Sequence, residues 1–429
     1  MEQSQAYIIY NLFPTLMGKI KNWHLHLDRI AKMGFNWIYV NPYHLPGKSG
    51  SLYSIKDYYR YHRALKSGNS DESTQKDLIE FIKKANDQGM KVMADLVINH
   101  TAIDSPLTIQ HPDWFVRDDQ GKIKNPCVKS ADIVTVVWHD LAEINNLHSQ
   151  DKDNLWQYWL ELIHHYISLG FEGFRCDAAY QVPPQLWEYL INNVKQKAPD
   201  TKFFAETLGC ELKETITVIH AGFDLIFNSS KWWDFKQPWC IEQYNDTHSL
   251  APSISFAESH DTVRLAKETK QCRKRIKMRY LFSTLFSAGT LMPVGFEYGF
   301  TKRLDVCKTS TKDWEKTDID LSDYISICNK IKNKYPIFHH DSPIEIIQHP
   351  IDNLLALLKT SFDKKEQALI LINLDMKKSN PIGFDDLYQI ITVHDKITDI
   401  SPEKMIPIIN QSFKYRLSPK EIKVLYAKA

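Results

Sequence analysis

GFRCDA, residues 173–178, is a short, buried-looking strand that carries two charged side chains, Arg175 and Asp177. Side chains two positions apart on a strand point to the same face, so this arginine and this aspartate lie side by side. An adjacent guanidinium favours the ionised form of a carboxyl group and fixes its direction. The segment therefore predicts an oriented anion at Asp177, suited to a nucleophile, with a structural ion pair as the alternative.

Apolar strand-like runs and amphipathic helical stretches alternate on both sides of this segment. Residues 72–88 and 154–169, for example, carry apolar side chains at helical spacing. Strands that each follow a helix are typical of parallel sheets, and eight such units predict an α/β fold, a (β/α)8 TIM barrel. The expected strands occupy residues 6–11, 36–42, 91–100, 171–177, 202–206, 223–228, 253–258 and 290–297.

Two segments depart from this alternation. Residues 101–146 are polar and lack a helical period, which predicts a short excursion after the third strand, on the side of a barrel where active sites form. Residues from 340 onward contain short β-rich runs between polar turns, which predict antiparallel strands. We therefore expect a catalytic barrel over 1–339, including the excursion as a short inserted domain, and a C-terminal β-sandwich domain over 340–429.

The charges of the chain nearly cancel, with 53 Lys and Arg against 52 Asp and Glu, and both signs are interspersed. Such a chain has no single-sign field that would attract nucleic acid or an anionic membrane. Its longest uncharged apolar stretch, residues 281–296, contains glycine and proline and is shorter than the roughly 18 residues of a membrane span. The composition predicts a neutral partner, without nucleic acid or membrane binding.

The cysteines and the first residues bear on location. The seven cysteines are an odd number without a C-x-x-C pair, which is typical of reduced thiols. The segment MEQSQAYIIYNLFPTL has no basic region or small-residue cleavage pattern, so no classical signal peptide is predicted. A cytoplasmic location is the default expectation, and export by a route without such a signal is left open.

Polar side chains close several of the predicted strands. The carboxyl ends of barrel strands meet at one rim, so these side chains should converge there. Each one alone is more often a helix cap, a turn residue or a satisfied polar group. Together they are difficult to explain as structure alone. They are Asp95, Asn99 and His100 on the third strand, Arg175 and Asp177 on the fourth, Glu206 on the fifth, and His260 and Asp261 after the seventh.

Four of these segments resemble, in the same order and at similar spacing, the four sequence regions of the α-amylase family, glycoside hydrolase family thirteen. They are DLVINH, GFRCDAAY, FFAETLG and FAESHD. The resemblance covers most of the chain, because NWIYVNP, SLYSIKDYY, HDLAEIN and YRLSPKEIKVLYA also look like segments of that family. Within the family, AGFDLIFNSSKWWDF and APSISFAESHDTVRLA resemble a bacterial branch near the maltosyltransferases that extend glucans from maltose 1-phosphate.

The resemblance implies a retaining mechanism with three carboxylates. Asp177 would be the nucleophile that forms a glycosyl-enzyme intermediate, and Glu206 would be the general acid and base, with the two carboxyl groups roughly 5 Å apart. Glu206 leaves an apolar strand, where desolvation favours the neutral form that a general acid needs. Asp261 would hold sugar hydroxyls and stabilise the positive charge of the transition state.

The resemblance also implies substrate-binding roles for five further residues. The imidazoles would bind hydroxyl groups of the reacting sugar, and the arginine of the motif strand would orient the nucleophile. The loop tyrosine would offer its ring to the same sugar, with an ordinary loop aromatic as the alternative. The last arginine would reach the neighbouring sugar or the Asp261 side of the site. These residues are His100, His260, Arg175, Tyr53 and Arg264.

The sequence departs from the family pattern near the nucleophile and near the tyrosine. Tyr180 and Gln181 stand where many amylases have Lys-His, which predicts different leaving-group subsites. That histidine often contributes to a calcium site, so its loss argues against calcium, although Asn99 matches the family's calcium-binding asparagine. The sequence assigns no cofactor or metal, and Ca²⁺ at Asn99 is the alternative. Leu52 and Ser54 replace the usual glycine and aspartate beside the tyrosine.

The sequence favours a retaining α-amylase-type hydrolase that cleaves internal α-1,4 bonds of starch, glycogen or maltooligosaccharides. One alternative is a maltosyl- or glucanotransferase with the same carboxylates, for which Lys231 is a candidate to bind a phosphorylated donor. The other is a non-catalytic glucan-binding barrel, which the retained carboxylates disfavour. The expected partner is an α-glucan or maltooligosaccharide, and the oligomeric state is left open.

Overall fold

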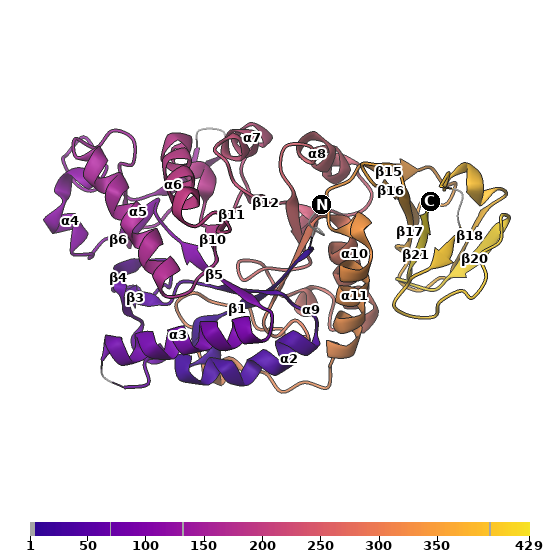
Figure 1. Ribbon diagram of the computed structural model, residues 1–429, viewed down its shortest axis with the longest axis horizontal. Helices are drawn as coiled ribbons and strands as arrows, with labels where there is room; N and C mark the ends of the chain where they lie inside the picture. The colour runs from indigo at the N-terminus through magenta and orange to yellow at the C-terminus, as the bar shows by residue number, and fades with distance from the viewer. Residues whose placement is uncertain (1–4, 69, 131–132, 394–395) are drawn as a thin grey trace.

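The computed structural model describes residues 5–68, 70–130, 133–393 and 396–429, and its larger part is a closed barrel of parallel strands (Figure 1). The barrel order, β1-β14-β13-β12-β11-β10-β5-β2, joins each strand to its predecessor in the chain and closes between the first and the last. The predicted TIM barrel is confirmed. Its strands are β1 (Tyr7–Leu12), β2 (Trp37–Val40), β5 (Lys91–Leu96), β10 (Gly173–Cys176), β11 (Lys202–Ala205), β12 (Leu225–Phe227), β13 (Ser253–Phe256) and β14 (Gly289–Pro293).

Register brings the charged side chains of two neighbouring strands together. Arg175 on β10 lies opposite Asp95 on β5 and opposite Phe204 on β11. Alternate positions of the strands point into the barrel, where side chains such as Trp37 and Phe256 form one buried cluster with Phe204. The motif strand therefore projects its arginine into the barrel at the level of a carboxylate.

Helices cover the outside of the barrel, as the alternating pattern predicts (Figure 1). In α3, Ser70 caps the first turn by accepting a hydrogen bond from the Ser73 amide at 3.1 Å. The helices are α1 (Pro14–Met17), α2 (Leu27–Lys32), α3 (Asp71–Asp87), α5 (Lys152–Ser168), α6 (Pro184–Lys197), α7 (Leu212–His220), α8 (Trp239–Thr247), α9 (Leu265–Glu268), α10 (Arg273–Phe286) and α11 (Ser322–Lys334).

The third barrel strand is shorter than predicted. The sequence indicates a strand over 91–100, but β5 ends at Leu96, and the chain then leaves the barrel into β6 (His100–Ala102). β6 pairs with β9 (Leu141–Glu143), which closes the base of the predicted excursion. Between them lie α4 (Leu107–Gln110), β7 (Cys127–Ser130) and β8 (Ile133–Val137), and a second hairpin, β3 (His44–Pro46) with β4 (Ile55–Tyr61), carries Tyr53 in its connection.

The C-terminal part is an antiparallel β domain, as predicted. It lies beyond α10 and α11, at the opposite end of the molecule from α4 (Figure 1). Its five-stranded sheet has the order β15-β16-β17-β21-β19, and β18 pairs with β20. The proposed division into 1–339 and 340–429 falls between α11 and β15. The strands are β15 (Ile344–Ile347), β16 (Leu354–Thr360), β17 (Glu366–Asn373), β18 (Asn380–Phe384), β19 (Thr398–Asp399), β20 (Phe413–Leu417) and β21 (Ile422–Lys428).

Buried polar contacts attach this domain to the barrel. The Lys359 ammonium donates to the Phe286 carbonyl at 2.7 Å and lies 3.2 Å from the Tyr244 hydroxyl. Asp341 accepts hydrogen bonds from the amides of Ser253 and Ala288 at the start of two barrel strands. These contacts satisfy groups that burial would otherwise leave unpaired, so they fix how the β domain meets the barrel.

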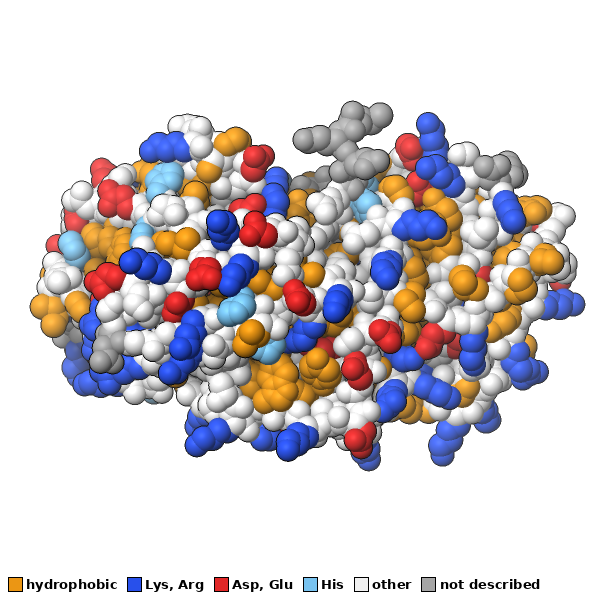
Figure 2. Space-filling model, turned by 60° about the horizontal axis from the view of Figure 1, so that its bottom comes forward, with side chains coloured by type: hydrophobic (Ala, Val, Ile, Leu, Met, Phe, Trp, Pro, Cys, Tyr) orange, Lys and Arg blue, Asp and Glu red, His pale blue; other side chains and the backbone are white. Residues whose placement is uncertain are grey.

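The surface carries no dominant charge on the face shown in Figure 2, where lysine and arginine side chains alternate with acidic ones. This agrees with the near-zero net charge of the sequence. Among the helices in the described part of the chain, none is both long and apolar enough to cross a membrane.

The close packing of the motif strand generates a stability prediction. A Cβ atom on Gly173 would lie 3.0 Å from the Trp37 ring and 3.1 Å from the Lys202 carbonyl oxygen, which cannot move aside. We expect Gly173→Ala to lower the free energy of unfolding by about 1–3 kcal/mol. Gly68 is exposed, and its nearest neighbour would be the Ser73 hydroxyl at 3.8 Å, so Gly68→Ala is the matched control. Urea denaturation measures both, and equal midpoints would contradict the packing argument.

Candidate active site

The polar side chains predicted to converge do meet at the carboxyl end of the barrel. They come from β5, β10 and β11 and from the turn after β13, and four of them, Arg175, Glu206, His260 and Asp261, line one small cavity with an apolar wall. This arrangement follows from the parallel topology, because every strand delivers its last residues to the same rim. The cavity is lined by Tyr39, Arg175, Glu206, Leu208, Phe227, Phe256, Ser259, His260, Asp261 and Leu291.

The guanidinium of Arg175 is the centre of the site. Its Nη1 lies 2.6 Å from Asp177 Oδ1 and 3.0 Å from Asp95 Oδ1, and its Nη2 lies 3.8 Å from Glu206 Oε2. The arginine is buried, and both acids of the expected catalytic pair are within reach of one planar group. That proximity is compatible with the short carboxyl separation of a retaining pair.

Arg175 is one cation beside three carboxylates. Burial raises the pKa of Asp177 above its ordinary value, and the Arg175 charge opposes this rise without cancelling it. Arg175 also faces Asp95 and Glu206, so its charge is shared among them, and the ionised state of Asp177 stays a prediction.

Glu206 retains its proton most readily. Burial raises its pKa to about 7, with repulsion from Asp177 and Asp261 adding to the effect and Arg175 opposing it. Its carboxyl group is held in place by two backbone amides: Ala178 N–H donates to Oε2 at 2.8 Å, and Leu208 N–H donates to Oε1 at 2.9 Å. The neutral form that a general acid needs is therefore available near pH 7, as the sequence predicts.

Ala178 holds an uncommon backbone conformation directly after the predicted nucleophile. Its φ of 41° lies in the left-handed region, which residues other than glycine seldom adopt. This turn aims the Ala178 amide at Glu206 while Asp177 stays beside Arg175. Backbone strain at this point couples the directions of the two carboxyl groups.

Tyr53 is anchored at the rim through its hydroxyl group. The hydroxyl lies 2.7 Å from Asp95 Oδ2, 2.6 Å from His260 Nε2 and 3.0 Å from Asn41 Nδ2. Its ring stacks on the His260 ring with centroids 5.7 Å apart and planes 3° apart. The hairpin loop thus brings this tyrosine to the carboxylate cluster even though Leu52 and Ser54 replace the usual neighbours.

The two predicted histidines are neutral and have different contacts. Burial lowers the pKa of His100 to about 4, and its Nε2 lies 3.1 Å from the Tyr53 carbonyl oxygen, so this ring supports the tyrosine loop. Burial also lowers the pKa of His260. Its Nδ1 is buried and has no hydrogen-bond partner within the described residues, which suits a group that binds a sugar hydroxyl.

Asp261 is the most accessible of the predicted carboxylates, with 53% of its side chain exposed. Its Oδ2 lies 3.1 Å from His260 Nε2, and its backbone carbonyl accepts a hydrogen bond from Arg303 at 2.6 Å. An exposed carboxylate at the cavity mouth can reach hydroxyl groups of an entering sugar. Arg303 was not predicted, and no motif in the sequence marks it.

Two further polar residues of the site were missed on the second strand. Tyr39 donates to Asp95 Oδ2 at 2.5 Å, and Asn41 donates to the hydroxyls of Tyr39 and Tyr53 at 3.0 Å. Their alternation with Trp37 places all three on the inner face, a signal that the sequence does contain. Asp95 therefore belongs to the central network, whereas the sequence analysis named it only among the polar residues that close the third strand.

The structure contradicts the expectation that Arg264 contacts a sugar. Its side chain is 1% exposed and forms an ion pair with Glu258 at 2.8 Å. The remaining donors of its guanidinium bind the carbonyls of Val294 and Lys302 at 2.8 and 3.1 Å. The buried Glu258, just after β13, needs a positive partner, so the side chain of Arg264 turns inward.

The side chains near Asn99 provide few of the oxygen ligands that calcium prefers. Its Oδ1 is buried without a hydrogen-bond partner in the described structure, as a cation ligand would be, but its Nδ2 donates to Gln181 at 3.1 Å. Calcium prefers several oxygen ligands that include carboxylates. The described residues contain no group of three or more His, Cys, Asp and Glu side chains that could hold a metal ion. No chemical step is assigned to calcium.

Comparisons with known proteins agree with this picture. The glucanotransferase domain of glycogen debranching enzyme matches as a family model over residues 3–117. An α-1,4-glucan:maltose-1-phosphate maltosyltransferase of Burkholderia pseudomallei is 24% identical over 86% of this chain and 33% of its own length. Alpha-amylase 2 of Dictyoglomus thermophilum is 22% identical over 86% of this chain and 66% of its own.

The chain thus spans between a third and two thirds of these relatives. Among solved structures, the α-amylase of Geobacillus thermoleovorans complexed with acarbose has a TM-score of 0.80 at 17% identity, covering 100% of this chain and 99% of that one. The resemblance expected from the four motifs is confirmed.

The raised pKa of Glu206 generates a prediction about stability. A carboxyl group whose pKa rises from 4.5 to about 7 on folding stabilises the fold below pH 4.5, and this contribution disappears as the pH rises through 7. We expect the wild type to lose up to about 3 kcal/mol over this interval. Glu206→Gln cannot ionise and should not show this loss.

Thermal denaturation at pH 4.5, 6 and 8 measures the effect, with Glu188→Gln, an exposed glutamate on α6, as the control. Parallel pH profiles for wild type and Glu206→Gln would contradict the pKa assignment.

The donor set around Asn99 generates a prediction about metal removal. Because its amide already binds Gln181, we expect excess EDTA to leave the melting temperature unchanged. The opposite result would be a melting temperature that EDTA lowers and Ca²⁺ restores in the wild type but not in Asn99→Ala. It would show that Asn99 Oδ1 binds calcium.

Proposed function

We propose that this chain, which belongs to the α-amylase family, cleaves α-1,4-glucosidic bonds with retention of configuration and passes the glycosyl group to a glucan acceptor. One observation carries the retaining chemistry. A single buried guanidinium, Arg175, lies 2.6 Å from Asp177 and 3.8 Å from Glu206, and the second of these carboxyl groups has its pKa raised to about 7. Two neighbouring carboxyl groups with different affinities for a proton are what a double displacement requires.

In the first step, Asp177 attacks the anomeric carbon of the donor glucan. Glu206 gives its proton to the glycosidic oxygen, so the carbon–oxygen bond breaks and the leaving chain departs as an alcohol. Asp261 holds hydroxyls of the same sugar and stabilises the positive charge that develops at the anomeric carbon. The product is a covalent ester between the donor sugar and Asp177.

In the second step, Glu206 acts as a base. It removes the proton from the incoming hydroxyl group, whose oxygen attacks the anomeric carbon and releases Asp177. A glucan hydroxyl gives transfer, and water gives hydrolysis. The site carboxylates treat both acceptors alike, so the loops around the cavity decide between them.

Relatives favour transfer over the hydrolysis that the sequence alone suggested. The family model that matches residues 3–117 describes a glucanotransferase domain, and the Burkholderia relative is named a maltosyltransferase. Hydrolysis is the second candidate, and the Dictyoglomus relative named Alpha-amylase 2 supports it. A purely glucan-binding role is disfavoured because Asp177, Glu206 and Asp261 are all present at the rim.

The donor proposed here is a glucan, because Lys231 does not lie where it could hold a donor phosphate. Lys231, the residue suggested by the sequence for a phosphorylated donor, is buried in an ion pair with Glu268 and lines a different cavity from that of Arg175. A donor phosphate would need a free cation beside the leaving group. The expectation for Lys231 is therefore corrected, and glucan-to-glucan transfer is the reaction proposed.

Purified protein incubated with maltoheptaose, with and without maltose 1-phosphate, tests the proposal. We expect maltoheptaose alone to yield both shorter and longer maltooligosaccharides with the α configuration, because an acceptor glucan intercepts the intermediate. Chromatography of the products and NMR of their anomeric form measure this. Asp177→Asn is the blank and should lower the rate by several orders of magnitude.

Shorter products alone would establish hydrolysis as the main activity. Elongation that requires maltose 1-phosphate would contradict the glucan donor, and no turnover in either mixture would contradict an enzymatic role.

A further inference from the structure

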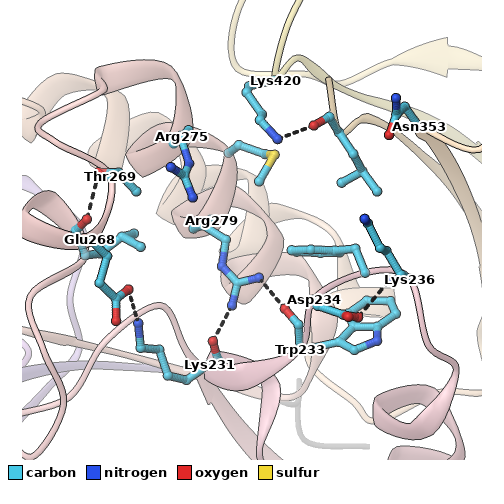
Figure 3. A pocket seen from close by; sticks show the side chains of 14 residues that line it. Lys231, Trp233, Asp234, Lys236, Glu268, Thr269, Arg275, Arg279, Asn353 and Lys420 are labelled. Carbon is cyan, nitrogen blue, oxygen red and sulfur yellow. Dashed lines mark hydrogen bonds and ion pairs between the residues drawn. The ribbon is translucent and has the colours of Figure 1, made fainter. Parts of the chain in front are cut away.

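A second cavity lies between the barrel and the C-terminal domain, apart from the catalytic rim. Its volume is about 420 Å³, which is within the range of small-molecule sites. Figure 3 shows its walls, formed by the loop after β12, by α9, by the first half of α10 and by the C-terminal domain. Its lining residues come from both domains.

Cations outnumber acids in its lining. The five cations are Lys231, Lys236, Arg275, Arg279 and Lys420, and the two acids are Asp234 and Glu268. Glu268 is engaged by the Lys231 ammonium at 2.7 Å. The Asp234 carboxylate turns to the backbone amides of Lys236 and Gln237, at 2.8 and 3.2 Å. Three or more positive charges therefore face the cavity without an acidic partner in the described structure.

Arg279 is the most firmly held of these cations. Its guanidinium donates to the carbonyls of Ser230, Lys231 and Trp233, at 2.9, 2.6 and 3.0 Å. These bonds fix its direction, and its guanidinium lies 4.7 Å from the centroid of the Phe235 ring. No ion pair joins it to a carboxylate in the described residues, and burial lowers its pKa to about 10 although Glu268 opposes this shift. A buried cation that costs stability in this way is a pre-oriented site for an anion.

Lys420 contributes a further cation, and this one comes from the C-terminal domain. Its ammonium donates to the Leu374 carbonyl, and Figure 3 shows it on the opposite wall from Lys231. Burial lowers the pKa of Lys420, and the positive charges of Arg275 and Arg279 lower it further, although the Asp375 carboxylate opposes this shift. The three cations are therefore close enough to repel one another, and an anion between them would relieve that repulsion.

Apolar side chains complete the lining. Trp233, Phe235, Met278 and Leu374 lie between the charged groups. Several donors from separate segments match the oxygen atoms of a phosphate, and a doubly charged group suits a cluster with several unpaired cations. The volume leaves room for more than the phosphate itself.

We propose that this cavity binds a small phosphomonoester, with its phosphate against Arg275, Arg279 and Lys420 and its organic part along Trp233 and Phe235. The site is distinct from the catalytic cavity, since the two share no lining residue. Its occupation stabilises the contact between the barrel and the C-terminal domain, because both contribute cations to the same anion.

Isothermal titration calorimetry of the full chain tests the site, with inorganic phosphate and glucose 1-phosphate as the probes and glucose as the neutral control. We expect both phosphate probes, and not glucose, to bind and to compete with each other. Binding should weaken as NaCl is raised, because salt screens the cations. Saturating maltoheptaose should not displace either probe, because it occupies the catalytic cavity.

Variants separate this site from general surface charge. Arg275→Gln and Lys420→Gln remove two partly exposed side chains from the proposed phosphate contacts, so the fold should persist. We expect each variant to raise the dissociation constant of glucose 1-phosphate by about tenfold, while activity on maltoheptaose stays unchanged. Lys267→Gln, an exposed lysine on the adjacent α9 outside the cavity lining, is the matched control and should bind as the wild type does.

Circular dichroism and the retained activity of each variant show that it is folded. Absence of binding by both phosphate probes, or equal affinity in wild type and the Arg275→Gln/Lys420→Gln double variant, would overturn the proposal. Displacement by maltoheptaose would also overturn it, by assigning the anion to the catalytic cavity. None of these outcomes bears on whether the carboxylates at the rim cleave glucans.

Discussion

The ion pairs of Arg175 are the constraint on which the catalytic rim depends. This one buried guanidinium lies within 3.0 Å of both Asp95 and Asp177 and within 3.8 Å of Glu206. Removing one partner of a buried pair leaves an uncompensated charge, so each carboxylate is held by the presence of the others. Burial raises the pKa of Glu206 to about 7, so near neutral pH this carboxyl group is partly protonated. Structure and acid–base function thus have the same origin.

The barrel supplies the geometry that this cluster needs. Parallel register sets Arg175 opposite Asp95, and the left-handed turn at Ala178 directs a backbone amide to Glu206. These are properties of regular strands and of one strained residue, so the carboxylates are fixed by rigid elements. Tyr53, in contrast, arrives on a hairpin loop and is held by hydrogen bonds of its hydroxyl group. The rim therefore combines a rigid centre with loop-borne groups that can differ between relatives.

The sequence predicts the eight-stranded barrel, the excursion and the C-terminal β domain, because periodicity and strand order are local signals. It also identifies Asp177, Glu206, Asp261, Tyr53 and both histidines, which the fold brings to one rim. It fails where a side chain's direction depends on a distant partner. Arg264 turns inward to Glu258, and Lys231 pairs with Glu268 in another cavity. Arg303 carries no motif, and the sharing of one guanidinium by three carboxylates appears only when neighbouring strands are in register.

The protonation of Glu206 has a consequence for the heat of substrate binding. The glucan proposed as substrate would displace water from around this carboxyl group on entering the cavity, and desolvation raises the affinity of a carboxyl group for a proton. Near pH 7 the group is only partly protonated in the free protein, so the complex takes up a fraction of a proton from the buffer. The enthalpy of binding then includes the ionisation heat of that buffer. Two buffers at the same pH would report different enthalpies for the same glucan, although the sugar itself carries no charge.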